Sequence, residues 1–134
     1  MIALDTNVLV RYLAQDDAEQ FKIAAELIGG CTAEAPGYIC REVMIELVWV
    51  LERAYKYTRH EISAALLGLV SASELEVETA DDVAAIVHLY KSEGFGFADL
   101  MIRQAATRRG VSVLKTFDQK LAKLSAVDLL GATH

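Results

Sequence analysis

Apolar residues at the amino end form a short run that a polar segment ends abruptly. Residues 1–4 are apolar, Asp5, Thr6 and Asn7 follow, and helical apolar periodicity resumes at Val8. This pattern predicts a short buried strand that ends at Asp5 and turns directly into a helix. In open parallel α/β sheets, ligands bind outside the carboxyl ends of the strands, which is where Asp5 would lie. Its simpler role is to cap the helix, since Asp, Asn and Thr accept bonds from free N–H groups there.

The same reasoning divides the rest of the chain into alternating helices and short strands. Start and stop signals predict helices that begin after Asp17, at Arg41, at a capping box of Thr58 and Glu61, after Thr79 and at Asp99. Short apolar or alternating runs predict strands at residues 38–40, 75–78, 111–114 and 126–129. This alternation predicts an α/β domain. Residues 111–114 are apolar and β-branched enough to fit a central parallel strand.

The helix that begins at Arg41 contains one acidic residue in an apolar segment. Between Val43 and Leu51 every residue is apolar except Glu46. A helix that is apolar all round is buried, so Glu46 is expected in the interior or at its rim. A buried carboxylate needs a partner, which is either a basic side chain or a metal ion. Glu42, one turn earlier, is expected at the solvated rim.

Two further acids are placed where elements begin or end. Asp99 follows a glycine-containing turn and starts a helix, and Asp118 follows the strand expected at residues 111–114. In contrast, Asp81 and Asp82 belong to a capping signature, Thr79-Ala80-Asp81-Asp82, and so have a sufficient structural explanation. We therefore expect four acids to converge at one edge of the sheet: Asp5, Glu46, Asp99 and Asp118.

A cluster of carboxylates is stable in its ionised form only beside a cation, because like charges raise one another's pKa values. Oxygen-only ligands indicate Mg²⁺ or Mn²⁺. Such a metal ion supplies an activated water and neutralises charge in phosphodiester hydrolysis. Thr6, Asn7 and Thr116 are expected to orient the carboxylates or the water.

Composition narrows the classes of protein that fit. The 134 residues match one domain, with 54% hydrophobic residues but no apolar run of about 20 that would span a membrane. The amino end lacks a signal-peptide pattern. The two cysteines form neither a metal-binding pair nor a disulfide pattern, so we expect a cytoplasmic protein. A net charge of −6 argues against nucleic-acid binding unless the acids hold cations.

Four motifs resemble those of PIN-domain ribonucleases, and more narrowly of VapC-type toxins of bacterial toxin–antitoxin pairs. They are LDTNVL at residues 4–9, Glu46 within VMIELVWVLER, Phe97-Ala98-Asp99 and Thr116-Phe117-Asp118. The resemblance covers essentially the whole chain, in the order and spacing of the family. It implies a three-layer α/β/α sandwich with a mainly parallel sheet over residues 1–134.

The resemblance also implies a site and partners. Asp5, Glu46, Asp99 and Asp118 would bind Mg²⁺ or Mn²⁺ and cut RNA, a VapB-like antitoxin would occupy a groove near the site, and the toxin would form a homodimer. Candidates for contacts with RNA phosphates are five arginines, Arg11, Arg41, Arg103, Arg108 and Arg109.

Two other functions remain open from the sequence. The first is a PIN-like module that binds without catalysis. The second is phosphoryl transfer through Asp5, but the related phosphatases need a second Asp two residues later, and that position is Asn7. Loss of metal binding would indicate the first alternative, and a trapped acyl phosphate the second.

Overall fold

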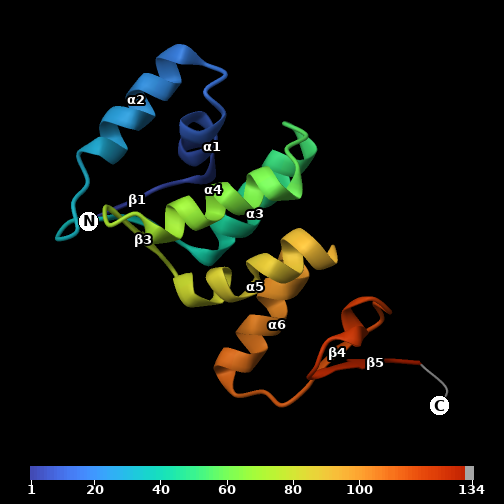
Figure 1. Cartoon of the computed structure of the whole chain (residues 1–134). Helices are drawn as coiled ribbons and strands as arrows, with labels where there is room; N and C mark the ends of the chain where they lie inside the picture. The colour runs from blue at the N-terminus through green and yellow to red at the C-terminus, as the bar shows by residue number, and fades with distance from the viewer. Residues whose placement is uncertain (132–134) are drawn as a thin grey trace. The chain divides into compact units, whose positions relative to one another are not determined.

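The computed structural model describes residues 1–131 and divides the chain into two compact units, residues 1–85 and the part from Ile86 onward (Figure 1). Residues 132–134, including His134, lie outside the described part. Every strand pair among the described residues is parallel, so the expected α/β class with a parallel sheet is confirmed. A single domain over residues 1–134 stays a prediction.

The sheet of the first unit has three parallel strands in the order β1 (Ile2–Ala3), β2 (Gly37–Ile39) and β3 (Leu75–Val77). The central strand begins at Gly37, which pairs with Ile2 on one side and Leu75 on the other. A Cβ atom at Gly37 would come within 2.9 Å of the Leu4 side chain. Glycine is therefore what allows the neighbouring side chains to close over this strand.

The first unit also contains four complete helices: α1 (Thr6–Ala14), α2 (Ala18–Gly29), α3 (Arg41–Arg53) and α4 (Arg59–Ser71). Helix α1 packs against α2 and α3, and α4 packs against α3 and β3. Their inward faces form the core together with Ile39 of β2, and completely buried helix side chains include Leu9, Leu47, Leu51 and Leu66. Burial of this apolar area is the main force that holds α1 and α3 together.

Local capping signals in the sequence correctly predicted where two of these helices begin. Asp17 accepts a hydrogen bond from the Gln20 backbone N–H at 3.0 Å and starts α2. Thr58 and Glu61 form a complete capping box at the start of α4, with reciprocal bonds of 3.1 and 2.8 Å.

Helix α5 (Ala80–Glu93) crosses the boundary between the units, which lies after Ala85. The second unit continues with α6 (Phe97–Arg109), β4 (Leu114–Thr116), the short 3₁₀ helix η1 (Leu121–Lys123) and β5 (Val127–Leu129). Strands β4 and β5 form a parallel pair. No helix in the part of the chain that the structure describes is long and apolar enough to cross a membrane.

The strand expected at residues 111–114 was misplaced, because β4 starts only at Leu114. Gly110 adopts a left-handed conformation at the end of α6, and the backbone N–H of Val111 donates to the Ala106 carbonyl at 2.9 Å. This bond commits Val111 to the end of the helix rather than to a strand. Val111 and Val113 are consequently exposed. The first strand is likewise shorter than expected and its Ile2 is exposed, although Leu4 is buried.

Candidate functional site

Asp5 occupies the position that its sequence context predicted, at the junction of β1 and α1. Its backbone is extended, and its Oδ1 accepts a hydrogen bond from the Thr6 backbone N–H at 2.7 Å, so Asp5 does cap the helix. The side chain is exposed, and its Oδ2 has no hydrogen-bond partner among the described residues. The cap thus fixes the carboxylate while leaving one oxygen available for a ligand.

Of the two positions expected for Glu46, the interior or its rim, the interior was wrong, because Glu46 is exposed on α3. Only one face of the helix is buried, through Met44, Leu47, Val48 and Leu51. The opposite side carries apolar residues into solvent, above all Trp49, which is 56% exposed. A continuous apolar run therefore did not mean that the whole circumference is covered.

Asp5 and Glu46 nevertheless line the same hollow, which has a volume of about 330 Å³ and lies between α1 and α3. All residues that line it belong to the first unit: Asp5, Thr6, Asn7, Val10, Arg11, Glu46, Val50, Ala54 and Tyr55. Two carboxylates from distant parts of the sequence thus face one solvent-filled space.

Thr6 adds an unusual polar group to this hollow. Thr6 is only 5% exposed, yet its hydroxyl oxygen has no hydrogen-bond partner among the described residues. A buried hydroxyl without a partner is costly, so such groups usually face a bound water or ion. Asn7, the next residue, is exposed and lines the same hollow.

Arg11 and Tyr55 form a polar network on the rim of this hollow. The Arg11 Nη1 group donates to Asp16 at 3.1 Å and to the Tyr55 hydroxyl at 3.1 Å, and Nε donates to Gln20 at 2.6 Å. The Tyr55 hydroxyl donates to Asp16 at 2.9 Å, and this bond is the main reason why the pKa of Asp16 lies below its usual value. Sequence reasoning proposed Arg11 but missed its partners: Asp16, five residues later, was interpreted only as the start of the next helix, and Tyr55 is 44 residues away.

The other two predicted acids, Asp99 and Asp118, form a pair of their own in the second unit. Asp99 lies in the first turn of α6, where a Cβ atom at Gly96 would come within 3.0 Å of its Oδ2. Burial, and then the nearby charge of Asp118, raise the pKa of Asp99 above its usual value. A cation beside Asp99 would offset both the burial and the Asp118 charge, which disfavour the ionised form of Asp99.

Backbone bonds hold Asp118 in a tight loop after β4. Its Oδ1 accepts from the N–H groups of Lys120 and Leu121, at 2.9 and 3.0 Å. The N–H of Asp118 itself donates to the Thr116 hydroxyl at 3.0 Å. Thr116 thus orients the backbone that carries the carboxylate.

The four acids are therefore found as two pairs, each within one unit. In neither unit do three or more Asp, Glu, His or Cys side chains of the described residues gather closely enough to hold a metal ion. Convergence of all four carboxylates stays a prediction.

Arg41 was wrongly included among the arginines available for RNA. Its Nη1 lies 3.2 Å from Asp82 and also donates to the Thr79 hydroxyl at 2.7 Å. Asp82 is buried and part of this ion pair, in the first turn of α5. Asp81, beside it in the same turn, is exposed.

Comparisons with known proteins gave one family match and one related protein. The family model described as PIN domain matches residues 2–127. A protein named VapC ribonuclease, from Aquifex aeolicus (strain VF5), is 25% identical over 125 residues, which cover 92% of each chain. No solved structure gives a significant match.

Proposed function

Because the chain belongs to the PIN domain family, we propose that it is a Mg²⁺- or Mn²⁺-dependent endoribonuclease that hydrolyses phosphodiester bonds in RNA. The observation that carries the proposal is the hollow that Asp5 and Glu46 share beside the unpartnered hydroxyl of Thr6. Asp99 and Asp118 are assigned to metal binding in the same reaction. The name of the Aquifex relative, VapC ribonuclease, supports RNA as the substrate.

The residues present fit a hard divalent cation. Carboxylate, hydroxyl and amide oxygens are the donors that Mg²⁺ and Mn²⁺ prefer. When bound, such a metal ion supplies a water of lowered pKa and positive charge beside the phosphate. The raised pKa of Asp99 beside Asp118 also indicates a site that gains stability from positive charge.

The chain's own residues prepare this chemistry. Asp5 is held by its cap to α1 and lines the hollow together with Glu46 of α3. Thr6 and Asn7 are proposed to hydrogen-bond and orient the water or the carboxylates from the first turn of α1. Thr116 fixes the loop of Asp118 in the second unit.

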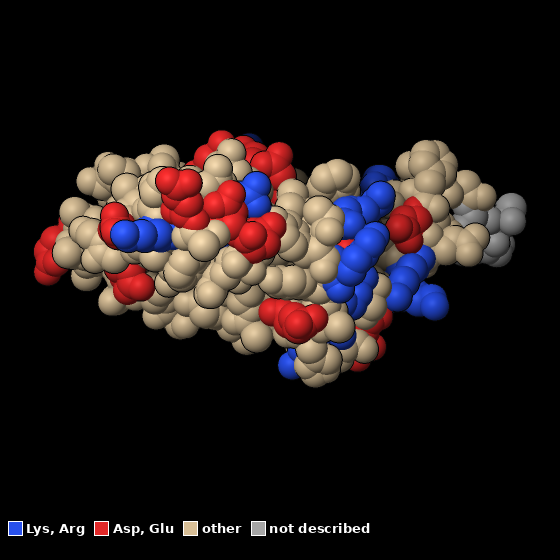
Figure 2. Space-filling view, turned by 90° about the horizontal axis from the view of Figure 1, so that it is seen from above, with Lys and Arg blue, Asp and Glu red and all other residues tan. Residues whose placement is uncertain are grey.

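The charges of the chain are distributed unevenly, which removes the objection that an acidic protein would repel RNA. Residues 86–134 contain seven Lys and Arg against four Asp and Glu, whereas residues 1–85 contain six against fifteen. Figure 2 shows the largest group of Lys and Arg side chains close together on one part of this face, whereas most of the acidic side chains in view lie outside it. Phosphate contacts are therefore expected chiefly in the carboxyl-terminal part, which also carries Asp99 and Asp118.

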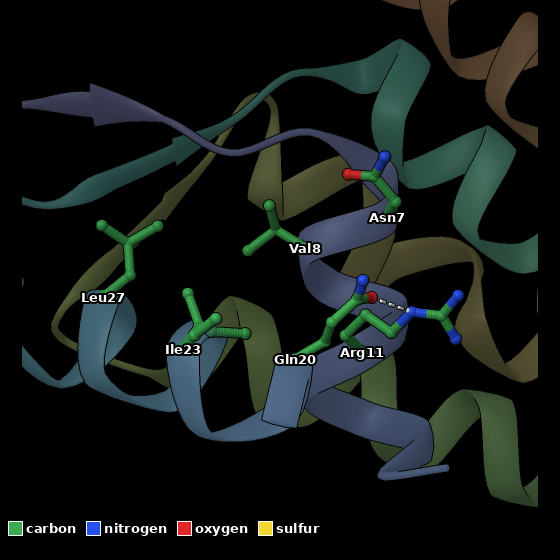
Figure 3. Close-up of a pocket in the computed structure, with 7 residues that line it drawn as sticks. Asn7, Val8, Arg11, Gln20, Ile23 and Leu27 are labelled. Carbon is green, nitrogen blue, oxygen red and sulfur yellow. Dashed lines mark hydrogen bonds between the residues drawn. The ribbon is translucent and has the colours of Figure 1, made fainter. Parts of the chain in front are cut away.

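We also propose that the chain is a cytoplasmic toxin with a VapB-like antitoxin and that it forms a homodimer. A second hollow, of about 470 Å³, lies between α1 and α2 and is lined partly by Ile23 and Leu27, which are 62% and 44% exposed (Figure 3). Exposed apolar side chains along a groove suit an amphipathic partner segment. Light scattering of the free toxin, and of the toxin purified with the adjacently encoded protein, tests both assemblies.

The proposed activity is tested by incubating the purified protein with total RNA in Mg²⁺ or Mn²⁺, in EDTA, and as the Asp5→Asn variant. Asn keeps a side-chain oxygen that can cap α1, so the variant should fold. Cleavage that needs the metal and disappears in the variant supports the proposal. If the variant cuts as well as the wild type, the assignment of Asp5 is wrong.

If the protein cuts no RNA, Mn²⁺ binding is measured by titration monitored by electron paramagnetic resonance. Binding that is lost in Asp5→Asn would direct the search to a narrower RNA target. Absence of binding would favour the non-catalytic module, and acyl-phosphate formation on Asp5 would favour phosphoryl transfer.

A further inference from the structure

The guanidinium group of Arg11 is held in one orientation by three side chains. Asp16 and Tyr55 occupy its Nη1 group, and Gln20 occupies Nε. Figure 3 shows the bond to Gln20 and the guanidinium carried beyond it, away from Ile23 and Leu27. Most of the rotational freedom of a long side chain is therefore already lost before any ligand arrives.

One nitrogen of this group remains available. Nη2, with two N–H donors, has no hydrogen bond to any of the described residues. Arg11 lines the hollow of Asp5 and Glu46, and Asn7 lies one turn earlier on the same face of α1. A preorganised cation beside two carboxylates is an arrangement suited to an anion that must approach a metal-binding site.

Stabilisation of the fold does not account well for this network. The side chains of Arg11 and Asp16 are 35% and 44% exposed. An ion pair that is this exposed contributes little to the free energy of unfolding. The bonds of Arg11 to Tyr55 and Gln20 therefore matter more for orienting its guanidinium at the rim than for the stability of the fold.

We infer that Arg11 binds a phosphate of the RNA backbone at the rim of the hollow, through the free Nη2 edge of its guanidinium. Asp16, Gln20 and Tyr55 position Arg11 for this contact and do not themselves touch the RNA. The inference rests on the proposed function, because it places the bound strand next to Asp5 and Glu46.

The test measures binding rather than cleavage. A fluorescein-labelled single-stranded RNA of about 20 nucleotides and mixed sequence is titrated with the full chain, and anisotropy is recorded at several salt concentrations. A gel after each titration confirms that the RNA is intact. The variants are Arg11→Gln and, as a matched control, Arg53→Gln, because Arg53 is an exposed arginine of the same unit that lies over Trp49 and not on the hollow.

For Arg11→Gln we expect an affinity about tenfold lower and a salt slope smaller by about 0.7, the value for one phosphate contact on a single strand. Arg53→Gln should leave both quantities unchanged. The loss should be similar for RNAs of different sequence, since a backbone phosphate carries no base information.

Asp16→Asn separates phosphate binding from a purely structural role. Both Arg11→Gln and Asp16→Asn remove the same ion pair, so a structural role predicts parallel losses of melting temperature and RNA affinity. Phosphate binding predicts that Asp16→Asn keeps most of the RNA affinity, because the asparagine retains a side-chain oxygen that can accept from the Arg11 Nη1 group and keep Arg11 in position. Melting curves of each variant confirm that the protein is folded.

Equal losses of RNA affinity in Arg11→Gln and Asp16→Asn would overturn the inference, and so would an unchanged affinity in Arg11→Gln. If the wild type cuts RNA and Arg11→Gln binds RNA normally, only the role of Arg11 is rejected. A wild-type protein that neither binds nor cuts RNA would reject the proposed function along with it.

Discussion

The Nη1 atom of Arg41 lies 3.2 Å from the Oδ2 atom of Asp82, which connects the start of α3 to the start of α5. The side chains are 17% and 9% exposed, respectively, so this ion pair is largely shielded from water. Shielded pairs differ from surface pairs, because removal of one partner leaves the other charge without compensation in a medium of low polarity.

We predict that Asp82→Asn lowers the free energy of unfolding by about 1 to 3 kcal/mol, less than for a fully buried pair because Arg41 is partly solvated. The matched control is Asp81→Asn, whose side chain is exposed and which should change stability by no more than about 0.5 kcal/mol. Urea unfolding of both variants measures this difference. Equal stabilities would show that the ion pair is unimportant.

A second prediction concerns Asp99, whose pKa burial and Asp118 raise above the ordinary value of 3.8. A carboxyl group with a raised pKa in the folded state costs stability when it is ionised. Asp99→Asn should therefore raise the melting temperature of the metal-free protein at neutral pH. The difference should shrink as the pH falls through the folded pKa and disappear below 3.8, where both states bind the proton.

Added Mg²⁺ provides the control for this prediction. It should stabilise the wild type, because a ligand that binds only the folded state raises its stability, and should have a smaller effect on Asp99→Asn. A variant that is less stable than the wild type at neutral pH without metal would contradict the account of Asp99.

A third prediction concerns the capping box of α4, where Thr58 and Glu61 bond reciprocally. Thr58→Ala removes the hydroxyl that accepts from the Glu61 N–H and should destabilise the fold by about 1 kcal/mol. Thr58→Ser, which keeps the hydroxyl, should restore most of this loss. Thermal unfolding followed by circular dichroism compares the two, and equal losses would mean that the bond contributes nothing.

Features that depend on a few neighbouring residues were predicted well from the sequence. The caps formed by Asp17 and Thr58, and the alternation of buried Leu75 and Val77 with exposed Glu76, each follow from local hydrogen bonding or from the period of a strand. The position of Asp5 between a strand and a helix has the same origin.

Features that depend on tertiary packing were not predicted from the sequence. The apolar run around Glu46 did not reveal that one side of α3 faces solvent. Likewise, the pattern of residues 111–114 did not reveal that Val111 forms a backbone hydrogen bond to the last turns of α6. The bond of Arg11 with Tyr55 joins residues that are distant in the sequence. Four acids could thus be named from motifs, whereas their partners required the structure.

The most direct test of the central claim uses two glutamates one turn apart on α3. Glu46 lines the hollow with Asp5, whereas Glu42 is exposed and does not line it. Metal-dependent cleavage of RNA is measured for Glu46→Gln and for Glu42→Gln. We predict that Glu46→Gln loses at least about a hundredfold in kcat/KM while Glu42→Gln remains close to the wild type. Equal activity of the two variants would contradict the assignment of Glu46, and with it the site shared with Asp5.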